Sequence, residues 1–326
     1  MIVAVALATA ALTEAPGAAE AQTSTGYLYI ANSSDNTVSV VNPALQQLVA
    51  VIPVGDEPWA DAATPDGSQI YVADQGSAEV QVISTATNTV TATIAIASGA
   101  TSIVISADGT RAYVLDRDAA AVSVIDIATE QVVATIAIPL TGIYPKGLPW
   151  GIAVSANGKR VYTTSEGGAV TVINAVTDTV VKTLPAGEYA MGIAVSPDGN
   201  QLYVTDASPD AQGELTVMNS STGKVIAQIV VGPSPTDVTL SPNGKIAYVV
   251  DNEVNMVSEI DTSTDALKAT VALAPGGKSW SVTATTGIAY IPDYGTNSVE
   301  EVIPGEAQSF SVGGYTSNGP VAIAVS

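Results

Sequence analysis

The stretch QLYVTD at residues 201–206 is one of seven related segments along the chain. The other copies are YLYIAN (27–32), QIYVAD (69–74), RAYVLD (111–116), RVYTTS (160–165), IAYVVD (246–251) and IAYIPD (288–293). The tyrosines at the third position of these segments lie 42, 42, 49, 41, 45 and 42 residues apart. A repeat of about 40–45 residues that holds several short strands is typical of a β-propeller blade. Seven copies therefore predict seven blades.

Each period reads as four short strands joined by turns. An innermost strand such as GIAVS (151–155) comes first, a turn such as PDG (65–67) follows, and the tyrosine strand comes next. A third strand such as AVSVID (121–126) and an outer strand such as QVVATIAI (131–138) complete the unit. The Asp-Gly and Asn-Gly turns supply the positive φ that a tight hairpin needs, and β-branched strands suit blades packed face to face. The pattern predicts an all-β, seven-bladed propeller of four-stranded antiparallel blades.

The two ends of the repeat region are predicted to meet in one blade. The first tyrosine strand has no innermost strand before it, and PVAIAVS at 320–326 reads as an innermost strand. We therefore expect the C-terminal strand to close the N-terminal blade, which removes the exposed edges that invite aggregation. The predicted domain is a single propeller over residues 27–326, preceded by a short tail at 22–26, and we expect it to be monomeric.

Residues 1–21 are predicted to be an export signal or the remnant of one. Residues 2–12 form an apolar segment that is too short to span a membrane, and AEA at 19–21 is an A-x-A cleavage pattern. An apolar helix that caps the domain is the structural alternative. No other segment is long and apolar enough to cross a membrane. We expect a secreted, periplasmic or cell-surface protein.

Composition excludes several kinds of partner and chemistry. The 326 residues carry 31 acidic and 10 basic side chains, a net charge of −21, and such a surface repels nucleic acid. Cysteine and histidine are both absent, which excludes disulfides, thiol nucleophiles, Cys/His zinc sites, haem held by His or Cys, and Ser-His-Asp catalysis. Acid–base chemistry would fall to Asp, Glu, Lys or Tyr. The cofactor is left open, with a divalent cation held by carboxylates as a candidate.

Three segments of the repeat carry a family resemblance: LYVTD (202–206), TVSVV (37–41) and VVATIAI (132–138). They resemble the YVTN-type β-propeller repeat of surface-layer and periplasmic proteins, and the resemblance extends over residues 27–326. It implies the propeller fold and an extracytoplasmic location. Propellers of this kind host diverse roles, so the resemblance does not imply one activity.

One position per blade is predicted to lie at the rim of the central channel, and all three tryptophans of the chain occupy it. The seven rim residues are Trp59, Thr101, Trp150, Met191, Thr236, Trp280 and Val321. Further candidate ligand-binding residues in loops of the same face are Tyr144, Glu188, Tyr189, Tyr294 and Tyr315. Aromatic residues at a concave mouth are a usual feature of ligand sites. The alternative is that each tryptophan only packs onto its own blade.

Two insertions fall in loops of this same face. The first, PLTGIYPKGLPWG at 139–151, places Lys146 above the channel, and the second is ASPDAQGE at 207–214. Insertions concentrated on one face of a repeat protein usually mark the working face. Neutral drift in surface loops, which tolerate added length, is the alternative.

Asp61 departs most sharply from the repeat. The aligned innermost-strand residues of the other blades are Ile103, Ile152, Ile193, Val238, Val282 and Ile323. An unpaired carboxylate in such a packed position is costly unless it stays protonated. In the functional interpretation, Asp61 and Asp237 at the mouth bind a cation, anchor a substrate or accept a proton. In the structural interpretation, Asp61 accepts hydrogen bonds from loop N–H groups or a buried water.

Two other polar features have structural interpretations. The tyrosine strand ends in a polar residue in every blade: Asn32, Asp74, Asp116, Ser165, Asp206, Asp251 and Asp293. We expect these side chains to cap the following turn through backbone N–H groups. Glu259 replaces a valine of the third strand, and hairpin counting places Lys268 nearly opposite it, as a cross-strand ion pair. Glu301 replaces the same valine in the next blade and has no predicted partner.

Two functions of different class are consistent with these observations. The first is an extracytoplasmic binding or interaction module that holds a small molecule, a glycan or a protein at the channel mouth. The alternative is a histidine-independent lyase, hydrolase or isomerase, in which Asp61 or Asp237 is the base or metal ligand and Lys146, Lys278 or Tyr189 stabilises an anion. A third interpretation is a subunit that docks its acidic surface onto a basic partner. No catalytic motif is present, which favours the first.

Overall fold

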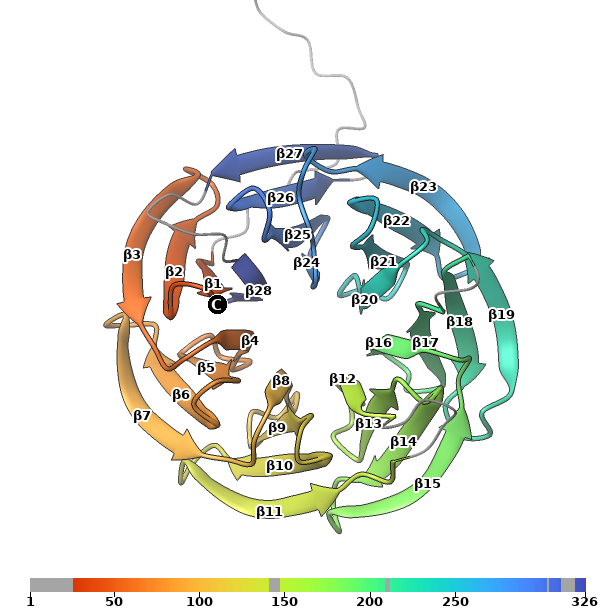
Figure 1. Ribbon diagram of the computed structural model, residues 1–326, viewed down its shortest axis with the longest axis horizontal. Coiled ribbons are helices and arrows are strands. Elements are labelled where there is room, and N and C mark those ends of the chain that lie inside the picture. The colour runs from red at the N-terminus through yellow and green to blue at the C-terminus, as the bar shows by residue number, and fades with distance from the viewer. Residues whose placement is uncertain (1–25, 141–146, 209–211, 304, 312–319) are drawn as a thin grey trace, which may run out of the picture.

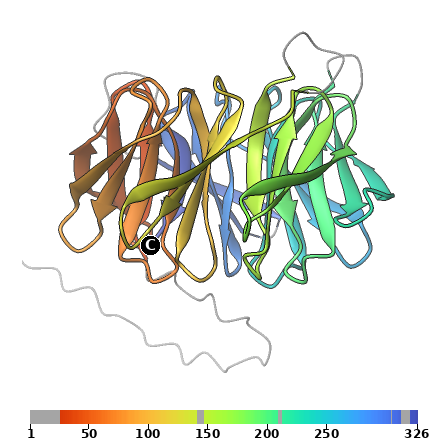
Figure 2. The ribbon, with the colours of Figure 1, turned by 90° about the horizontal axis from the view of Figure 1, so that it is seen from below.

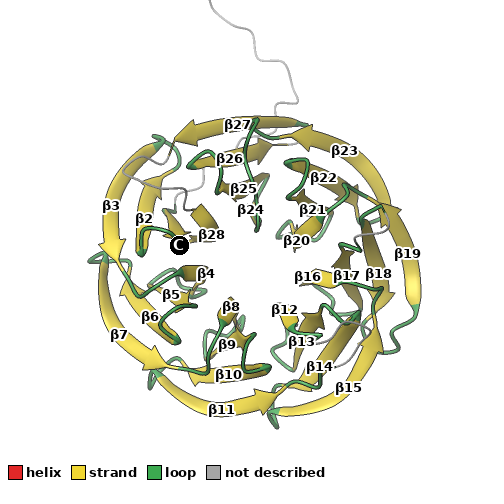
Figure 3. Cartoon of the chain, viewed as in Figure 1, coloured by secondary structure: helices red, strands yellow, loops and turns green. Residues whose placement is uncertain are grey.

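The computed structural model describes residues 26–140, 147–208, 212–303, 305–311 and 320–326. These residues form seven four-stranded antiparallel sheets that stand as blades around a central axis (Figure 1). Seen from the side, the strands run between two faces on which the loops emerge (Figure 2). The described residues contain no helix (Figure 3). The predicted all-β, seven-bladed propeller is confirmed.

Each blade contains four strands, which follow one another from the channel outward. Blade 1 contains β28 (Pro320–Val325), β1 (Leu28–Asn32), β2 (Thr37–Asn42) and β3 (Gln47–Pro53). Blade 2 contains β4 (Pro58–Ala63), β5 (Gln69–Asp74), β6 (Glu79–Ser84) and β7 (Thr89–Ala95). Blade 3 contains β8 (Ala100–Ile105), β9 (Arg111–Asp116), β10 (Ala121–Asp126) and β11 (Gln131–Ala137). Blade 4 contains β12 (Pro149–Val154), β13 (Arg160–Ser165), β14 (Ala169–Asn174) and β15 (Thr179–Pro185).

The remaining three blades follow the same order. Blade 5 contains β16 (Ala190–Val195), β17 (Gln201–Asp206), β18 (Glu214–Asn219) and β19 (Val225–Val230). Blade 6 contains β20 (Pro235–Leu240), β21 (Ile246–Asp251), β22 (Met256–Asp261) and β23 (Ala266–Ala272). Blade 7 contains β24 (Thr283–Thr285), β25 (Ile288–Asp293), β26 (Ser298–Ile303) and β27 (Glu306–Ser311).

The ring closes through β28, as the sequence predicts. This strand pairs antiparallel with β1, with Ile323 opposite Ile30 and Val325 opposite Leu28. Blade 1 is therefore built from both ends of the repeat region, and β28 lies beside the channel (Figure 1). Because β28 covers the inner edge of β1, that edge is not left open for pairing with another chain.

The hydrophobic core lies between neighbouring blades. One cluster joins Tyr29 and Val40 of blade 1 to Ile70 and Val72 of blade 2, and the other blades repeat this arrangement. The tyrosine strands are buried along almost their whole length, whereas the outer strands alternate exposed and covered residues. The period-two pattern of the sequence is thus explained by sheets that pack face to face.

The Asp-Gly and Asn-Gly segments form turns, as predicted. In blade 2, Gly67 has a φ of 68°, and the Oδ1 of Asp66 accepts hydrogen bonds from the Thr64 hydroxyl at 2.6 Å and the Ser68 N–H at 3.1 Å. The same bonds form around Asp108, Asn157, Asp198 and Asn243. These side chains are engaged in local turn geometry.

The polar residues that end the tyrosine strands bond in different ways. Asp206 accepts N–H bonds from Glu188, Tyr189 and Ser208, and Asp251 and Asp293 make the same kind of bonds to their own loops. The predicted capping is confirmed at these three. The prediction is wrong for the other four. The side-chain oxygens of Asp74 and Ser165 have no hydrogen-bond partner among the described residues, whereas Asn32 donates to the Thr37 and Ser39 hydroxyls and Asp116 accepts from the Ser123 hydroxyl.

Glu259 and Lys268 form the predicted cross-strand ion pair. The Nζ of Lys268 lies 3.4 Å from the Oε2 of Glu259, which is 1% exposed. The other Glu259 oxygen accepts a bond from the N–H of Gly305 in blade 7, at 3.1 Å. This buried carboxylate is therefore satisfied by blades 6 and 7 together.

Several predictions fall outside the described residues. They are the export signal at 1–21, most of the tail at 22–26, parts of both insertions (141–146 and 209–211), and Tyr144, Lys146 and Tyr315. Within the described residues, no helix is long and apolar enough to cross a membrane.

Candidate functional site

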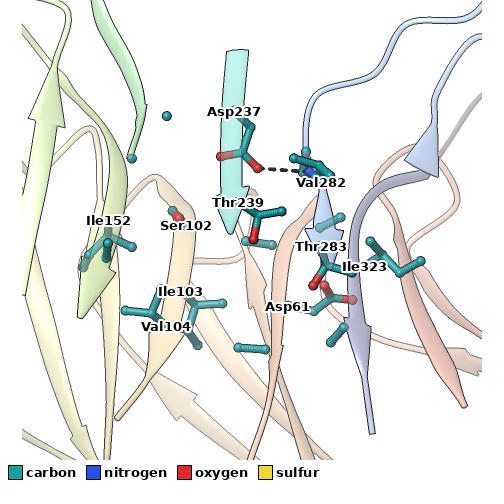
Figure 4. Close-up of a pocket in the computed structure, with 18 of the residues that line it drawn as sticks. Asp61, Ser102, Ile103, Val104, Ile152, Asp237, Thr239, Val282, Thr283 and Ile323 are labelled. Carbon is teal, nitrogen blue, oxygen red and sulfur yellow. Dashed lines mark hydrogen bonds between the residues drawn. The ribbon is translucent and has the colours of Figure 1, made fainter. Parts of the chain in front are cut away.

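A central cavity of 760 Å³ is lined by residues of the innermost-strand segments of all seven blades. Its walls are built from small and β-branched residues, because the inner edges of the blades converge there. Ser102, Ile103, Val104, Thr239 and Thr283 are examples (Figure 4). The described lining includes two ionisable side chains, Asp61 and Asp237, and no Lys or Arg. The cavity therefore suits a neutral or cationic guest better than an anion.

The three tryptophans meet at one end of this cavity. The rings of Trp59 and Trp280 have centroids 6.2 Å apart at an angle of 54°, and those of Trp150 and Trp280 are 6.3 Å apart at 41°. These are tilted contacts of the kind that aromatic pairs favour. Blades 2, 4 and 7 supply the rings, so the contacts join blades that are not neighbours. The tryptophans form one aromatic cluster at the rim, instead of packing only onto their own blades.

Arg117 extends the aromatic cluster, although the repeat pattern does not single it out. Its guanidinium carbon lies 5.0 Å from the centre of the Trp150 ring, within the range of a cation–π contact. The same guanidinium pairs with Glu166 at 2.5 Å, which ties the loop of blade 3 to the loop of blade 4. The sequence does contain a signal for Arg117: it is a basic residue directly after the strand-ending Asp116, in a chain with few basic residues.

Asp61 lies where the repeat places an apolar side chain between two blades. Its counterparts Ile103 and Val238 are 5% and 3% exposed. Both carboxyl oxygens of Asp61 are buried, and neither has a hydrogen-bond partner among the described residues. Burial raises the pKa of Asp61 well above its usual value, and the nearby backbone amide of Ala31 in blade 1 opposes this shift without reaching hydrogen-bonding geometry. No loop N–H group of the described residues bonds to Asp61, and the structural interpretation through a buried water stays a prediction.

Asp237 lies one position earlier in its strand than Asp61 does in its own strand. Asp237 faces the blade that follows it, blade 7, whereas Asp61 faces the blade that precedes it, blade 1. At this position the innermost strands approach closely, and a Cβ on the equivalent Gly192 would lie 2.5 Å from the Cα of Asp237. The Oδ2 of Asp237 accepts a hydrogen bond from the N–H of Val282 in blade 7, at 3.0 Å (Figure 4). Burial raises the pKa of Asp237 to about 7, although the N–H bond from Val282 opposes the shift. Asp237 therefore joins blades 6 and 7.

The other predicted site residues lie at different depths on the same face. Tyr294 packs in a small cluster with Trp280 and Val321, and its hydroxyl lies 3.5 Å from the Ser34 hydroxyl. Glu188 is exposed and accepts a bond from the Ser208 hydroxyl, and Tyr189 donates its backbone N–H to Asp206. Lys278 is exposed, and it does not line the cavity. Of this group, Tyr294 lies with the aromatic cluster.

No group of three or more acidic residues that could hold a metal ion occurs in the described part of the chain. Asp61 and Asp237 come from blades 2 and 6, and each carboxyl is directed toward a different neighbouring blade. A cation site made of both side chains stays a prediction.

The fold and this site define a seven-bladed β-propeller whose channel carries an aromatic cluster at one mouth. No protein-family model matches the chain, and no curated protein matches it either. Many solved structures resemble it, and two of them follow. Hydrazine synthase of Kuenenia stuttgartiensis has a TM-score of 0.72 and 21% identity, over 86% of this chain and 93% of that one. A functionally unknown protein from Desulfotomaculum acetoxidans has a TM-score of 0.75 and 14% identity, over 92% and 99%. At such identities the likeness shows the fold alone.

Proposed function

We propose that this protein is an extracytoplasmic binding module of the YVTN-type propeller family, which holds a ligand at the tryptophan-bearing mouth of its channel. The seven-bladed fold is consistent with an interaction module. The cluster of Trp59, Trp150 and Trp280 over a 760 Å³ cavity is the observation that carries the proposal. Flat aromatic rings beside a concave cavity offer stacking surface for a small molecule, a sugar or a peptide side chain.

The charge of the cavity narrows the ligand class. The ionisable groups of the described lining are carboxyls, and no cation balances them. An anionic ligand would meet two carboxyl groups in the cavity, and the nearby cation Arg117 at the mouth is already paired with Glu166, so we expect a neutral sugar or an organic amine. An amine that reached Asp61 would favour the ionised form of that carboxyl and compensate its burial.

The enzyme alternative has one observation in its favour. A carboxyl with a strongly raised pKa, as at Asp61, is a frequent feature of catalytic sites. The described lining provides no cationic side chain to stabilise an anionic intermediate, and Lys278 lies outside the cavity. The geometry therefore supports binding better than turnover.

A calorimetric screen of neutral oligosaccharides and organic amines tests this function. We expect a ligand that binds the wild-type protein and loses affinity at least about tenfold in Trp280→Ala, since Trp280 contacts both other tryptophans. Met191→Ala is the matched control, because Met191 holds the equivalent rim position in blade 5 and does not line the cavity. Turnover without stable binding, or equal losses in both variants, would contradict the proposal.

A further inference from the structure

A second cavity, of 430 Å³, lies between blades 4 and 5 at the end of the strands opposite to the tryptophan cluster. We call it the basic groove, because Lys159, Arg160 and Lys182 line it. The whole chain has 10 basic residues against 31 acidic ones, so three cations in one cavity are a strong local departure from the average. Asp198 is the acidic residue of the lining, and its carboxylate is already occupied by Ser196 and Asn200.

Arg160 lacks the acidic partner that its counterpart has one blade earlier. Arg111 begins the tyrosine strand of blade 3, and its guanidinium pairs at 2.8 Å with Asp178 in the outer turn of blade 4. Arg160 begins the same strand of blade 4, but Gly223 occupies the position of Asp178 in blade 5. Its guanidinium donates to the carbonyl oxygen of Lys159 and makes no ion pair with a described residue. The glycine leaves the cation unpaired.

Lys182 adds a charge where the repeat carries alanine. It stands opposite Val172 in the outer hairpin of blade 4. The residues at this position in blades 1, 2, 3, 5 and 6 are Ala50, Ala92, Ala134, Ala227 and Ala269. The Nζ of Lys182 donates to the backbone carbonyl of Ser221, which fixes the ammonium at the groove. The other two hydrogens of the ammonium are available to a ligand.

We propose that the basic groove binds an oxyanion of the phosphate or sulfate type, carried on a small molecule. Arg160 supplies a planar fork of donors, Lys182 supplies a compact charge, and the Ser221 hydroxyl lies at the same wall. Arginine and lysine together with hydroxyl groups are the donors that tetrahedral oxyanions select. This site is separate from the channel mouth, and it binds an anion, which the channel mouth disfavours.

Titration with inorganic phosphate, followed through the backbone amide resonances of Ser220 and Ser221 at constant ionic strength, tests the groove. We expect saturable shifts below about 10 mM phosphate in the wild-type protein, and the same with sulfate. Lys182→Ala restores the residue of five other blades, so it should fold normally and bind at least about tenfold more weakly. Gly223→Asp should weaken phosphate as well, because the new carboxylate would pair with Arg160 as Asp178 pairs with Arg111.

Lys245→Ala is the control. It removes one lysine charge from the turn of blade 6 that corresponds to the Lys159 turn of blade 4, at the same end of the ring but outside the basic groove, and should leave phosphate affinity unchanged. The proposal is overturned if wild-type resonances do not shift, if Lys182→Ala binds as well as wild type, or if Lys245→Ala loses as much affinity. Acetate is the further probe, and acetate binding as tight as phosphate binding would contradict the assigned ligand class.

Discussion

At the scale of single residues, the two carboxyls of the channel wall are held in different ways. The sequence groups Asp61 with Asp237 because both depart from the repeat. The structure separates them, since Asp237 accepts a backbone N–H from Val282, whereas Asp61 has no partner among the described residues. The sequence shows that each of these residues departs from the repeat. It does not show which group each carboxyl contacts, because a contact between blades depends on how the strands approach one another in space.

Replacement of Asp61 by isoleucine should stabilise the protein. Asp61→Ile restores the apolar residue of the other blades and removes a buried carboxyl with no partner, so we expect the free energy of unfolding to rise by about 1–3 kcal/mol. Denaturant unfolding at constant m-value measures the change. A loss of stability of the same size would show that Asp61 satisfies buried N–H groups, and would end its candidacy as a site residue.

Replacement of Asp237 by alanine should have the opposite effect at pH 5. At that pH the Asp237 side chain is protonated and still accepts from Val282, so Asp237→Ala strands a buried N–H at about 1–3 kcal/mol. Ser102→Ala, at the equivalent position of blade 3, is the control and should change the unfolding free energy by less than about 0.5 kcal/mol. Equal effects of the two substitutions in chemical unfolding would refute the role of Asp237 between blades 6 and 7.

At the scale of elements, the repeat predicted the strands of each blade well, but it did not predict the contacts between residues of different blades. The four-strand period, the turns and the pairing of β28 with β1 follow from local patterns, and all are confirmed. The innermost strand of blade 7 is shorter than its alignment indicates, because β24 is reduced to Thr283–Thr285 and Val282 lies just before it. The contacts of Trp280 with Trp59 and Trp150 cross the channel, and no sequence spacing encodes them.

Removal of residues 320–326 should destroy cooperative unfolding. Without β28, the inner edge of β1 and the flank of β4 lose a neighbour, and an open sheet edge promotes association. Thermal unfolding and light scattering of the truncated protein test this expectation. A monomer with an unchanged melting temperature would mean that β28 is not needed for closure.

At the scale of the whole molecule, the net charge of −21 conceals two regions of opposite character. The channel lining carries carboxyls and aromatic rings, whereas the basic groove carries three cations on the far side of the ring. The aligned repeat positions predicted the aromatic rings and carboxyls of the channel, and the average charge disfavoured nucleic acid as a partner. It did not reveal the groove, because Arg160, Lys182 and Gly223 are far apart in the sequence and meet only across blades 4 and 5.

The stability of the whole molecule should decline as the pH rises from about 4 to about 8. Burial raises the pKa of Asp74 to about 8 and those of Asp116 and Asp237 to about 7. The folded state keeps these protons to higher pH than the unfolded chain, so their stabilising contribution is full below about pH 4 and is lost as pH rises through the folded values. Asp66 acts in the opposite sense, since the Thr64 hydroxyl and the Ser68 N–H and hydroxyl lower its pKa to about 2.

Thermal melts between pH 3 and pH 9 would measure this profile, with the highest melting temperature expected at about pH 4–5. Asp74→Asn should flatten the decline between about pH 5 and pH 8, because it removes the carboxyl with the highest pKa of these three. A melting temperature that increases steadily from pH 5 to pH 8 would contradict the pKa values assigned to these buried carboxyls.

The tryptophan emission of the intact protein tests the proposed site most directly. All three tryptophans of the chain belong to the aromatic cluster, so the signal reports on the channel mouth alone. A neutral sugar or organic amine that binds by calorimetry is predicted to change this emission with the same saturation curve. Binding by calorimetry that leaves the tryptophan emission unchanged would contradict a ligand site at the channel mouth.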